Sequence, residues 1–371
     1  MQIFMFTTRS IALTLWSCLL SSLFWLGCEK KDATTDNFSR KELLSNVANN
    51  LIIPNFTALK TQTDALQTAV SNLNSTPNAA NLTIAQAAFE QAYLAWLHCS
   101  MFNFGPAELP VFGTLAENIG LFPVNTLKIE NLIAANNTNF NNFDRDTRGF
   151  LALDYLLFDL NNNATNVLNA LQNPNRRAYV LAVANDLKNK IDKVNTDWAT
   201  YKDTFINNDG TDAGSSVSIL FNEFTKNYES IKNFKVGVPA GKRVGQIAPE
   251  PTRVEAYYAG LSVKFLKEHL RAIENVWFGK DRNGKDGVGF EEYLQAVSGG
   301  AELVSSTKTQ WANVVNITNN LPNSRLSDQL RTDLPRVEAV FTEMQKHTRY
   351  FKSDMSSLLG IAITYSSGDG D

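Results

Sequence analysis

Cysteine, glycine and proline are scarce in this chain, and each scarcity excludes a class of protein. Only three cysteines occur in 371 residues, and two of them, Cys18 and Cys28, lie in an apolar N-terminal segment. The rest of the chain has Cys99 alone, so no internal disulfide can stabilise it. Eleven prolines and 20 glycines are few for a protein of many short strands, which needs turn residues. We therefore expect long helices.

Positive charge is not in excess either. The formal net charge is -3, which leaves no basic surface to neutralise the phosphates of a nucleic acid. Hydrophobic residues make up 44% of the chain and charged residues 19%, as in globular proteins. The composition therefore predicts a folded protein with no nucleic-acid partner.

Sequence motifs for metals and phosphates are also missing. The three histidines, His98, His269 and His347, are far apart, and the chain contains no HExxH or CxxC motif and no glycine-rich phosphate loop. His269 shares a helical face with Phe265 and Val276, which favours a hydrogen-bonded core histidine over a metal ligand. We predict no cofactor and no bound metal.

The N-terminus has the pattern of an export signal. A charge-free run from Ser10 to Cys28 follows Arg9, as in a secretory signal peptide. The run ends in Leu26-Gly27-Cys28 and turns polar at once, which resembles a bacterial lipobox and predicts lipidation of Cys28. Two alternatives stay open: an uncleaved membrane anchor, since about 17 to 20 apolar residues can span a bilayer, and ordinary cleaved secretion.

Apolar residues recur at helical intervals through the remaining sequence, with no convincing strand alternation. The fold class is therefore all-α, built of up-and-down bundles. Residues 105–143 form a long connection that we expect to be mostly irregular, and such loops are usually functional. The expected helices cover residues 41–73 with an interruption at Pro54, 83–102, 146–158, 176–206, 215–235, 251–278, 301–320 and 325–363.

These patterns predict four regions. Residues 1–28 are the signal peptide with the lipobox, and residues 29–38 are a tether. Residues 39–208 form a first helical bundle and residues 209–371 a second, because a Gly- and Ser-rich stretch begins at Gly210. The predicted location is the cell envelope, with a lipid anchor in the outer membrane, on either its periplasmic or its surface face.

The most informative segment is the predicted helix 146–158. Apolar residues fill nearly every side of it, so we expect it to be buried all round. Asp154 then lies among Leu151, Leu157 and Phe158, where an unpaired carboxylate is strongly unfavourable. Its partner is an arginine, a tyrosine hydroxyl, a backbone N–H group or a ligand. A buried aspartate that only braces two helices is the structural alternative.

The same segment resembles the imelysin family, whose hallmark is GxHxxE within a run reading roughly RGxHAxEYLLF. Residues 148–158 read RGFLALDYLLF, with Gly149 and the acidic Asp154 at matching positions. The resemblance covers nearly the whole chain in the family's ordinary, non-permuted order. Its further pieces are Leu51–Pro54, Trp96 with Phe104–Pro106, Phe122–Asn125, Val254–Gly260, Asn275–Gly279 and Leu359–Tyr365.

The resemblance implies two similar four-helix bundles packed together, a site at their interface and a role in iron uptake. It places Arg148, Gly149, Leu151, Asp154 and Tyr155 at that site. For the partner of Asp154 we consider Arg145 and Arg148 on the same segment, and Tyr258 or His269 from the other bundle.

Two departures from the family motif bear on function. Leu151 replaces the motif histidine and Asp154 the glutamate, so the best metal ligand of a hydrolytic site is missing. We therefore predict a non-enzymatic lipoprotein that binds a small ligand or an envelope protein linked to iron acquisition. The alternatives are a structural or partner-docking lipoprotein with a decayed site, and a metallopeptidase whose histidines converge from distant helices.

Overall fold

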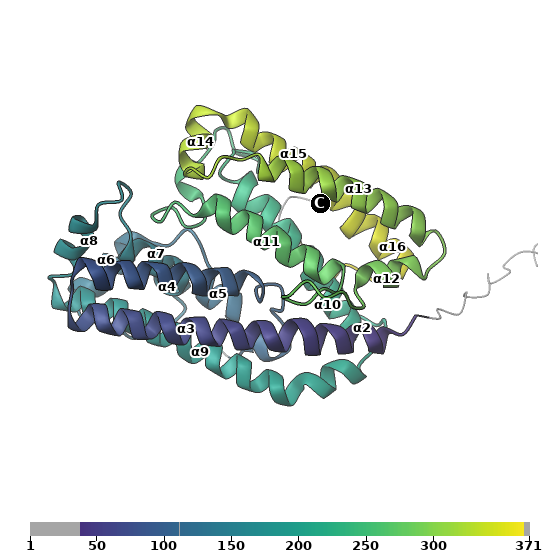
Figure 1. The fold of residues 1–371 in the computed structure, drawn as a ribbon, viewed down its shortest axis with the longest axis horizontal. Coiled ribbons are helices and arrows are strands. Elements are labelled where there is room, and N and C mark those ends of the chain that lie inside the picture. The colour runs from purple at the N-terminus through teal and green to yellow at the C-terminus, as the bar shows by residue number, and fades with distance from the viewer. Residues whose placement is uncertain (1–37, 111, 367–371) are drawn as a thin grey trace, which may run out of the picture. The chain divides into compact units, whose positions relative to one another are not determined.

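Helices make up nearly all of the regular secondary structure (Figure 1). The computed structural model describes residues 38–110 and 112–366. Within these residues the strands are limited to β1 (Glu108–Leu109) and β2 (Gly113–Thr114), so the all-α prediction is confirmed. The predicted signal peptide with Cys28, and the predicted tether up to Asn37, lie outside the described residues.

The first bundle consists of four helices. These are α3 (Ile53–Ser75), α4 (Ala79–Leu97), α7 (Phe150–Leu157) and α9 (Pro174–Asn207). Both α4 and α9 pack against α3 and against α7, which closes the bundle. The N-terminal helix α2 (Arg40–Asn46) continues into α3 through the π-helical segment η1 (Val47–Ile52). Pro54 lies in the first turn of α3, so the predicted interruption is a change of helix type rather than a break.

The second bundle has the same plan. Its four helices are α10 (Ser216–Ser230) with its π-helical continuation η4 (Ile231–Gly237), α11 (Ser262–Trp277), α13 (Gly300–Asn319) and α15 (Leu334–Arg349). Helix α11 packs against α10 and α13, and α15 packs against α13 and η4. Shorter elements surround it: η5 (Pro251–Arg253), α12 (Phe290–Gln295), α14 (Leu326–Thr332), η6 (Tyr350–Asp354) and α16 (Met355–Leu359).

Polar side chains set the starting points of the long helices. The side chains of Ser39, Asn78, Asn173 and Ser215 each accept a hydrogen bond from a backbone N–H in the first turn of α2, α4, α9 and α10, respectively. Such N-caps satisfy donors that the helix itself leaves unpaired. The sequence therefore encodes these helix starts locally.

The connection between α4 and α9 is more ordered than expected. The predicted irregular stretch, residues 105–143, contains η2 (Gly105–Ala107), the hairpin of β1 and β2, α5 (Leu115–Ile119) and α6 (Thr126–Ala134). After it, η3 (Arg145–Thr147) leads into α7, and α8 (Ala164–Ala170) lies between α7 and α9. The prediction of a mostly irregular segment is wrong, because each element is too short to show a period in the sequence. A capping box at Thr114, whose side chain pairs reciprocally with Glu117, starts α5.

Two predicted helices are shorter in the structure. The helix expected from residue 251 begins only at Ser262, because Ala256 and Gly260 adopt positive φ angles of 49° and 71° that a helix cannot contain. The helix expected over 325–363 is divided at Asp333 and changes to a π-helix at Tyr350.

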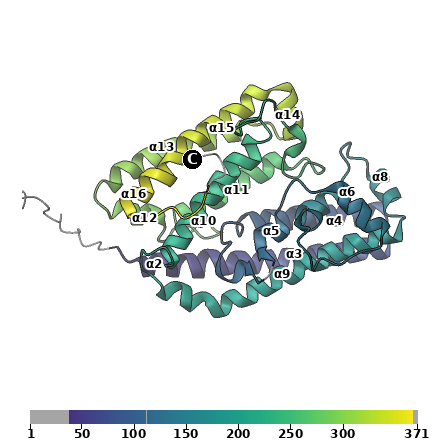
Figure 2. The same ribbon diagram turned by 180° about the vertical axis from the view of Figure 1, so that it is seen from behind.

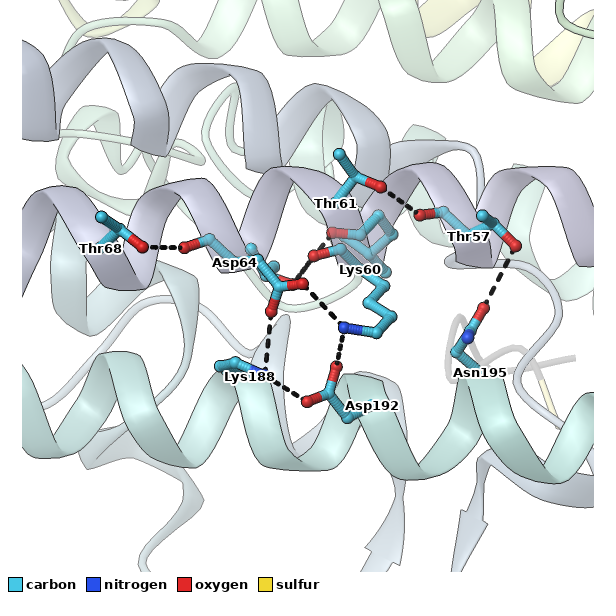
Figure 3. Close-up of polar contacts among 10 residues, drawn as sticks. Thr57, Lys60, Thr61, Asp64, Thr68, Lys188, Asp192 and Asn195 are labelled. Carbon is cyan, nitrogen blue, oxygen red and sulfur yellow. Dashed lines mark hydrogen bonds and ion pairs between the residues drawn. The ribbon is translucent and has the colours of Figure 1, made fainter.

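An ion-pair network joins α3 to α9 (Figure 3). Lys60 Nζ lies 2.7 Å from Asp64 Oδ2 and 3.1 Å from Asp192 Oδ1. Lys188 Nζ lies 2.9 Å from Asp64 Oδ1 and also pairs with Asp192. All four side chains are partly exposed, and exposed pairs contribute about 0–1 kcal/mol each. The network therefore aligns two helices whose buried faces provide most of the stability.

The two bundles meet along α4 and α11, which contact each other, and along α2, which contacts α10 and α12. Both views show α11 on the side of the second bundle that faces α4 (Figures 1 and 2). Tyr93 of α4 stacks on Phe265 of α11 with ring centroids 4.3 Å apart. From Phe38 onward the described residues cluster as one compact unit, and the boundary between residues 208 and 209 stays a prediction.

In the part of the chain that the structure describes, no helix is both long enough and apolar enough to cross a membrane.

Candidate functional site

The motif segment forms α7, which is buried on almost all sides. Leu151 is 3% exposed and Asp154 is 2% exposed, while Tyr155 is half-buried. The predicted burial of this helix and of Asp154 is confirmed. The helix is shorter than expected, because it begins at Phe150 after Gly149 rather than at residue 146.

Gly149 is required by the backbone. Its φ is 78° and its ψ is -166°, a combination that side-chain-bearing residues almost never adopt. A Cβ atom at this position would lie 2.6 Å from the carbonyl oxygen of Ile119 and 2.7 Å from its Cα. The glycine therefore lets α7 pack directly on the end of α5, a structural role.

Asp154 is held by backbone groups from the second half of the chain. Its Oδ2 accepts a hydrogen bond from the Tyr258 N–H at 3.0 Å, and its Oδ1 accepts one from the Ala259 N–H at 2.8 Å. These amides are free to donate because the chain is not helical there, with a positive φ at Ala256 and Gly260 on either side. The carboxylate therefore fastens the segment before α11 to α7.

Of the partners considered for Asp154, only Tyr258 contacts it, and through its backbone. His269 bonds elsewhere, as do both arginines. Arg148 is 1% exposed and donates to Asn118 Oδ1 at 2.7 Å, and Arg145 pairs with Glu117 at 3.1 Å. The two arginines therefore organise the connection before α7.

Burial governs the protonation of Asp154. Removal from water raises the pKa of Asp154 to about 7, because the charged form loses hydration. The two backbone N–H groups and the charge of Arg325 act in the opposite direction. Asp154 and Leu151, with Phe122, Arg253 and Tyr258, lie at a cavity of about 330 Å³.

Tyr155 and Tyr258 form an aromatic contact beside this cavity, with ring centroids 5.0 Å apart. The hydroxyl of Tyr155 donates to Glu130 Oε1 at 2.6 Å, and Arg176 pairs with the same oxygen at 2.6 Å. The Tyr155 hydroxyl therefore binds the Glu130–Arg176 ion pair of the first bundle.

A second cavity, of about 440 Å³, lies between the two bundles and is called the central cavity below. The first half of the chain contributes α4 and the segment around α5 to its lining, and the second half contributes α10, η4 and α11. Its lining residues include Tyr93, Trp96, Ser100, Asn227, Lys235, Glu255 and His269.

His269 lies at this cavity as a buried, hydrogen-bonded residue. Its Nε2 is 2.8 Å from Ser100 Oγ, so the prediction of a hydrogen-bonded core histidine is confirmed. Burial and the nearby charge of Lys235 lower the pKa of His269 well below its usual value. The imidazole is therefore neutral at pH 7.

A buried ion pair also contributes to the lining. Glu255 is 2% exposed, and its Oε1 accepts from the Tyr93 hydroxyl at 2.5 Å and lies 2.6 Å from Lys235 Nζ. Burial lowers the pKa of Lys235, and the carboxylate of Glu255 acts against this change. Burial, followed by the charge of Glu255, raises the pKa of Tyr93 well above its usual range.

Three polar atoms of the cavity-lining residues have no hydrogen-bond partner among the described residues. They are Glu255 Oε2, Asn227 Oδ1 and His269 Nδ1. An unpaired buried polar group costs about 1–3 kcal/mol, and native proteins keep few of them. The lining residues that carry these three atoms make the central cavity the candidate ligand site.

Sequence reasoning missed Tyr93, Ser100, Asn227, Lys235 and Glu255. Glu255 was noted only as part of the segment Val254–Gly260, and nothing in the local sequence marks Lys235 as buried. These residues come from separate elements and meet only through the packing of α4 against α11.

Comparison with known proteins identifies the family. The sequence pattern described as Imelysin matches residues 52–346, well over half of the chain. The chain belongs to the imelysin family. No protein of the curated collection matches it.

Two solved structures share the imelysin-family fold. An imelysin-like protein from Psychrobacter arcticum has a TM-score of 0.69 at 18% identity, covering 88% of this chain and 97% of its own. A candidate iron-regulated protein A precursor from Parabacteroides distasonis has a TM-score of 0.65 at 17% identity, covering 84% and 95%. At such identities the likeness establishes the fold alone.

The residues of this imelysin-family protein do not fit a metal at the motif. Leu151 offers no lone pair, and both oxygens of Asp154 already accept backbone hydrogen bonds. His98 pairs with Glu268 at 2.6 Å, and His347 packs among aromatic rings. Throughout the described residues, no three His, Cys, Asp or Glu side chains are grouped as metal ligands.

Proposed function

We propose that this imelysin-family protein binds a small ligand in the central cavity between its bundles, as a non-enzymatic, lipid-anchored protein of the cell envelope that serves iron acquisition. The observation that carries the proposal is the set of unpaired buried atoms of Glu255, Asn227 and His269 around a cavity of about 440 Å³. A cavity of this size with apolar walls and a few polar groups is typical of ligand sites.

The motif carboxylate supports the proposal indirectly. Asp154 is fully engaged by two backbone amides, so its role is to hold the two bundles together beside the cavities. The motif histidine is Leu151, which removes the residue that hydrolytic chemistry would need. The motif segment therefore fits the alternative of a decayed site. In our proposal the ligand binds in the central cavity instead.

The envelope and iron parts of the proposal have their own support. The charge-free run ending at Leu26-Gly27-Cys28 favours a lipid anchor in the outer membrane. One of the structural relatives is named as a candidate iron-regulated protein A precursor. If this protein has the same regulation, its abundance should rise severalfold in iron-depleted cultures, measured by quantitative mass spectrometry. An unchanged abundance would reject the link to iron.

Binding is tested by filling the cavity. Asn227 is half-buried in its lining, so Asn227→Trp should occupy the space that a ligand needs. Saturation-transfer NMR with indole, phenol, benzamide and benzoate should detect binding to the wild type and at least tenfold weaker binding to the variant.

The matched control is Asn207→Trp, which introduces the same ring at an exposed position of α9. This variant should bind the fragments like the wild type, and thermal melts should show that both variants fold. Binding that survives in Asn227→Trp, or no binding of any fragment to the wild type, would reject the central cavity as a ligand site.

A further inference from the structure

We infer that the ligand of the central cavity presents a protonated amine, or a similar group rich in hydrogen-bond donors, attached to a ring-sized apolar body. This inference rests on the proposed function and specifies its ligand class. It follows from the direction of the unpaired hydrogen-bonding groups, the charge balance of the lining and the nature of the walls.

Two of the three unpaired groups are acceptors. The carboxylate oxygen Oε2 of Glu255 and the amide oxygen Oδ1 of Asn227 can only accept, and neither has a partner in the described part of the chain. The third group, His269 Nδ1, is a donor or an acceptor according to the tautomer, because Ser100 Oγ lies 2.8 Å from His269 Nε2 and 3.2 Å from the Leu97 carbonyl oxygen. A ligand that completes the Glu255 and Asn227 positions must donate hydrogen bonds.

The residues that carry the unpaired groups come from three different elements. Asn227 lies on α10, Glu255 in the non-helical segment before α11, and His269 on α11. Ser100 connects two of them, because Asn227 Nδ2 lies 3.4 Å and His269 Nε2 lies 2.8 Å from its Oγ. Asn227 and His269 therefore share Ser100 as a neighbour, and Glu255 adds a third polar side chain to the same lining.

Charge balance argues against an anionic ligand. The lining contains two lysines and three glutamates. The ammonium of Lys235 is neutralised by Glu255 at 2.6 Å, and that of Lys226 by Glu223 at 2.8 Å. Both positive charges are thus matched before a ligand arrives, whereas Glu255 still has a free oxygen.

The walls favour an apolar body with a cationic end. Trp96, Phe122 and Phe234 line the cavity together with Leu121 and Ile231. Aromatic faces attract ammonium groups as well as apolar carbon. Phe234 and Leu121 are 40% and 38% exposed, so part of this apolar wall is open to solvent. At roughly 30 Å³ per water-sized group, about 440 Å³ admits a ligand of about fifteen such groups.

Three probes with one skeleton separate charge from shape: 2-phenylethylamine, 3-phenylpropanoate and 2-phenylethanol. Isothermal titration calorimetry on the full chain should show the amine binding at least tenfold more tightly than the carboxylate, with the alcohol between them. Equal affinities, or a preference for the carboxylate, would overturn the inference.

Two substitutions of Asn227, with opposite charges, test the inference while both members of the Lys235–Glu255 ion pair are kept. Asn227→Asp should tighten binding of the amine about tenfold, and Asn227→Lys should weaken it by a similar factor and favour the carboxylate. Glu255→Gln should weaken the amine at least tenfold and leave the alcohol nearly unchanged. Glu255→Gln removes the charged partner of Lys235. If this variant does not fold for that reason, the affinities of Asn227→Asp and Asn227→Lys for the amine decide the test.

Different results would reject the ligand class inferred here and the binding function proposed above. Fragments that bind the wild type and are blocked by Asn227→Trp, without any preference for the amine, would overturn the ligand class and keep the cavity as a binding site. If neither the fragments nor the three probes bind, both are rejected.

Discussion

Replacement of Asp154 by asparagine should change how the stability of the protein depends on pH. The carboxyl is 2% exposed and has a pKa of about 7 against an ordinary value of 3.8. A folded-state pKa above the unfolded value gives stability that is complete below pH 3.8 and is lost as the pH rises through 7. About three pKa units at about 1.36 kcal/mol each amount to a loss of about 4 kcal/mol in the wild type.

Asparagine does not titrate, and it offers one acceptor for the two amides of Tyr258 and Ala259. The variant should therefore be less stable than the wild type at pH 4.5, by about 1–3 kcal/mol for one lost hydrogen bond. Between pH 4.5 and 8.5 the wild type should lose about 3 kcal/mol of its free energy of unfolding relative to the variant, because most of the loss caused by ionisation of Asp154 falls in this range.

Urea unfolding followed by circular dichroism at several pH values measures this difference, with the denaturant slope checked for each protein. Asp159→Asn is the matched control. Hydrogen bonds, led by that from Asn166, lower the pKa of this partly exposed carboxyl, so the small effect of the control on the pH dependence should have the opposite sign. Parallel profiles for wild type and Asp154→Asn would refute the reasoning. A wild type that loses stability in acid relative to the variant would also refute it. The two backbone hydrogen bonds would then lower the pKa of Asp154 by more than burial raises it.

Two further predictions concern the motif glycine and the N-terminus. Gly149→Ala should lower the free energy of unfolding by more than about 3 kcal/mol, since backbone strain of about 1–3 kcal/mol adds to the clash with Ile119. Gly284→Ala, with a φ of 80° and open space around it, measures the strain alone, and equal losses in the two variants would contradict the clash. Cys28→Ser should abolish fatty-acid labelling, and labelling that persists, or a mature wild-type protein beginning at any residue other than Cys28, would show that the lipobox interpretation is wrong.

Much of the fold could be predicted because helices are local. The 3.6-residue recurrence of apolar residues indicated α9, α13 and the continuous helix of α2, η1 and α3 to within two residues at each end, and α4 to within five. The helix expected from residue 251 begins only at Ser262, because Ala256 and Gly260 adopt positive φ angles and the amides between them bond a distant carboxylate. The short elements between α4 and α9 depend on single turns and caps, which periodicity does not detect.

The candidate site was only partly predictable. An acidic residue in an otherwise apolar helix marked Asp154 as buried, and its partners follow from contacts 104 and 105 residues away along the chain. His269 was recognised as a core residue from its helical face, but its bond to Ser100 depends on how α10 and α11 pack on the end of α4. Lys235 and Glu255 have no sequence signal for their pairing.

The sequence by itself determined the helical fold, the family membership, and the positions of Gly149 and Asp154 in a buried segment, because these depend on periodicity and on residues close together in the chain. Tertiary structure alone decided what those residues contact. It assigned Asp154 to two backbone amides, and it gathered Glu255, Asn227 and His269 around the central cavity. The physical reason is that hydrogen bonding and desolvation act over a few ångströms in space, and only the packing of the two bundles brings groups this far apart in sequence within that distance.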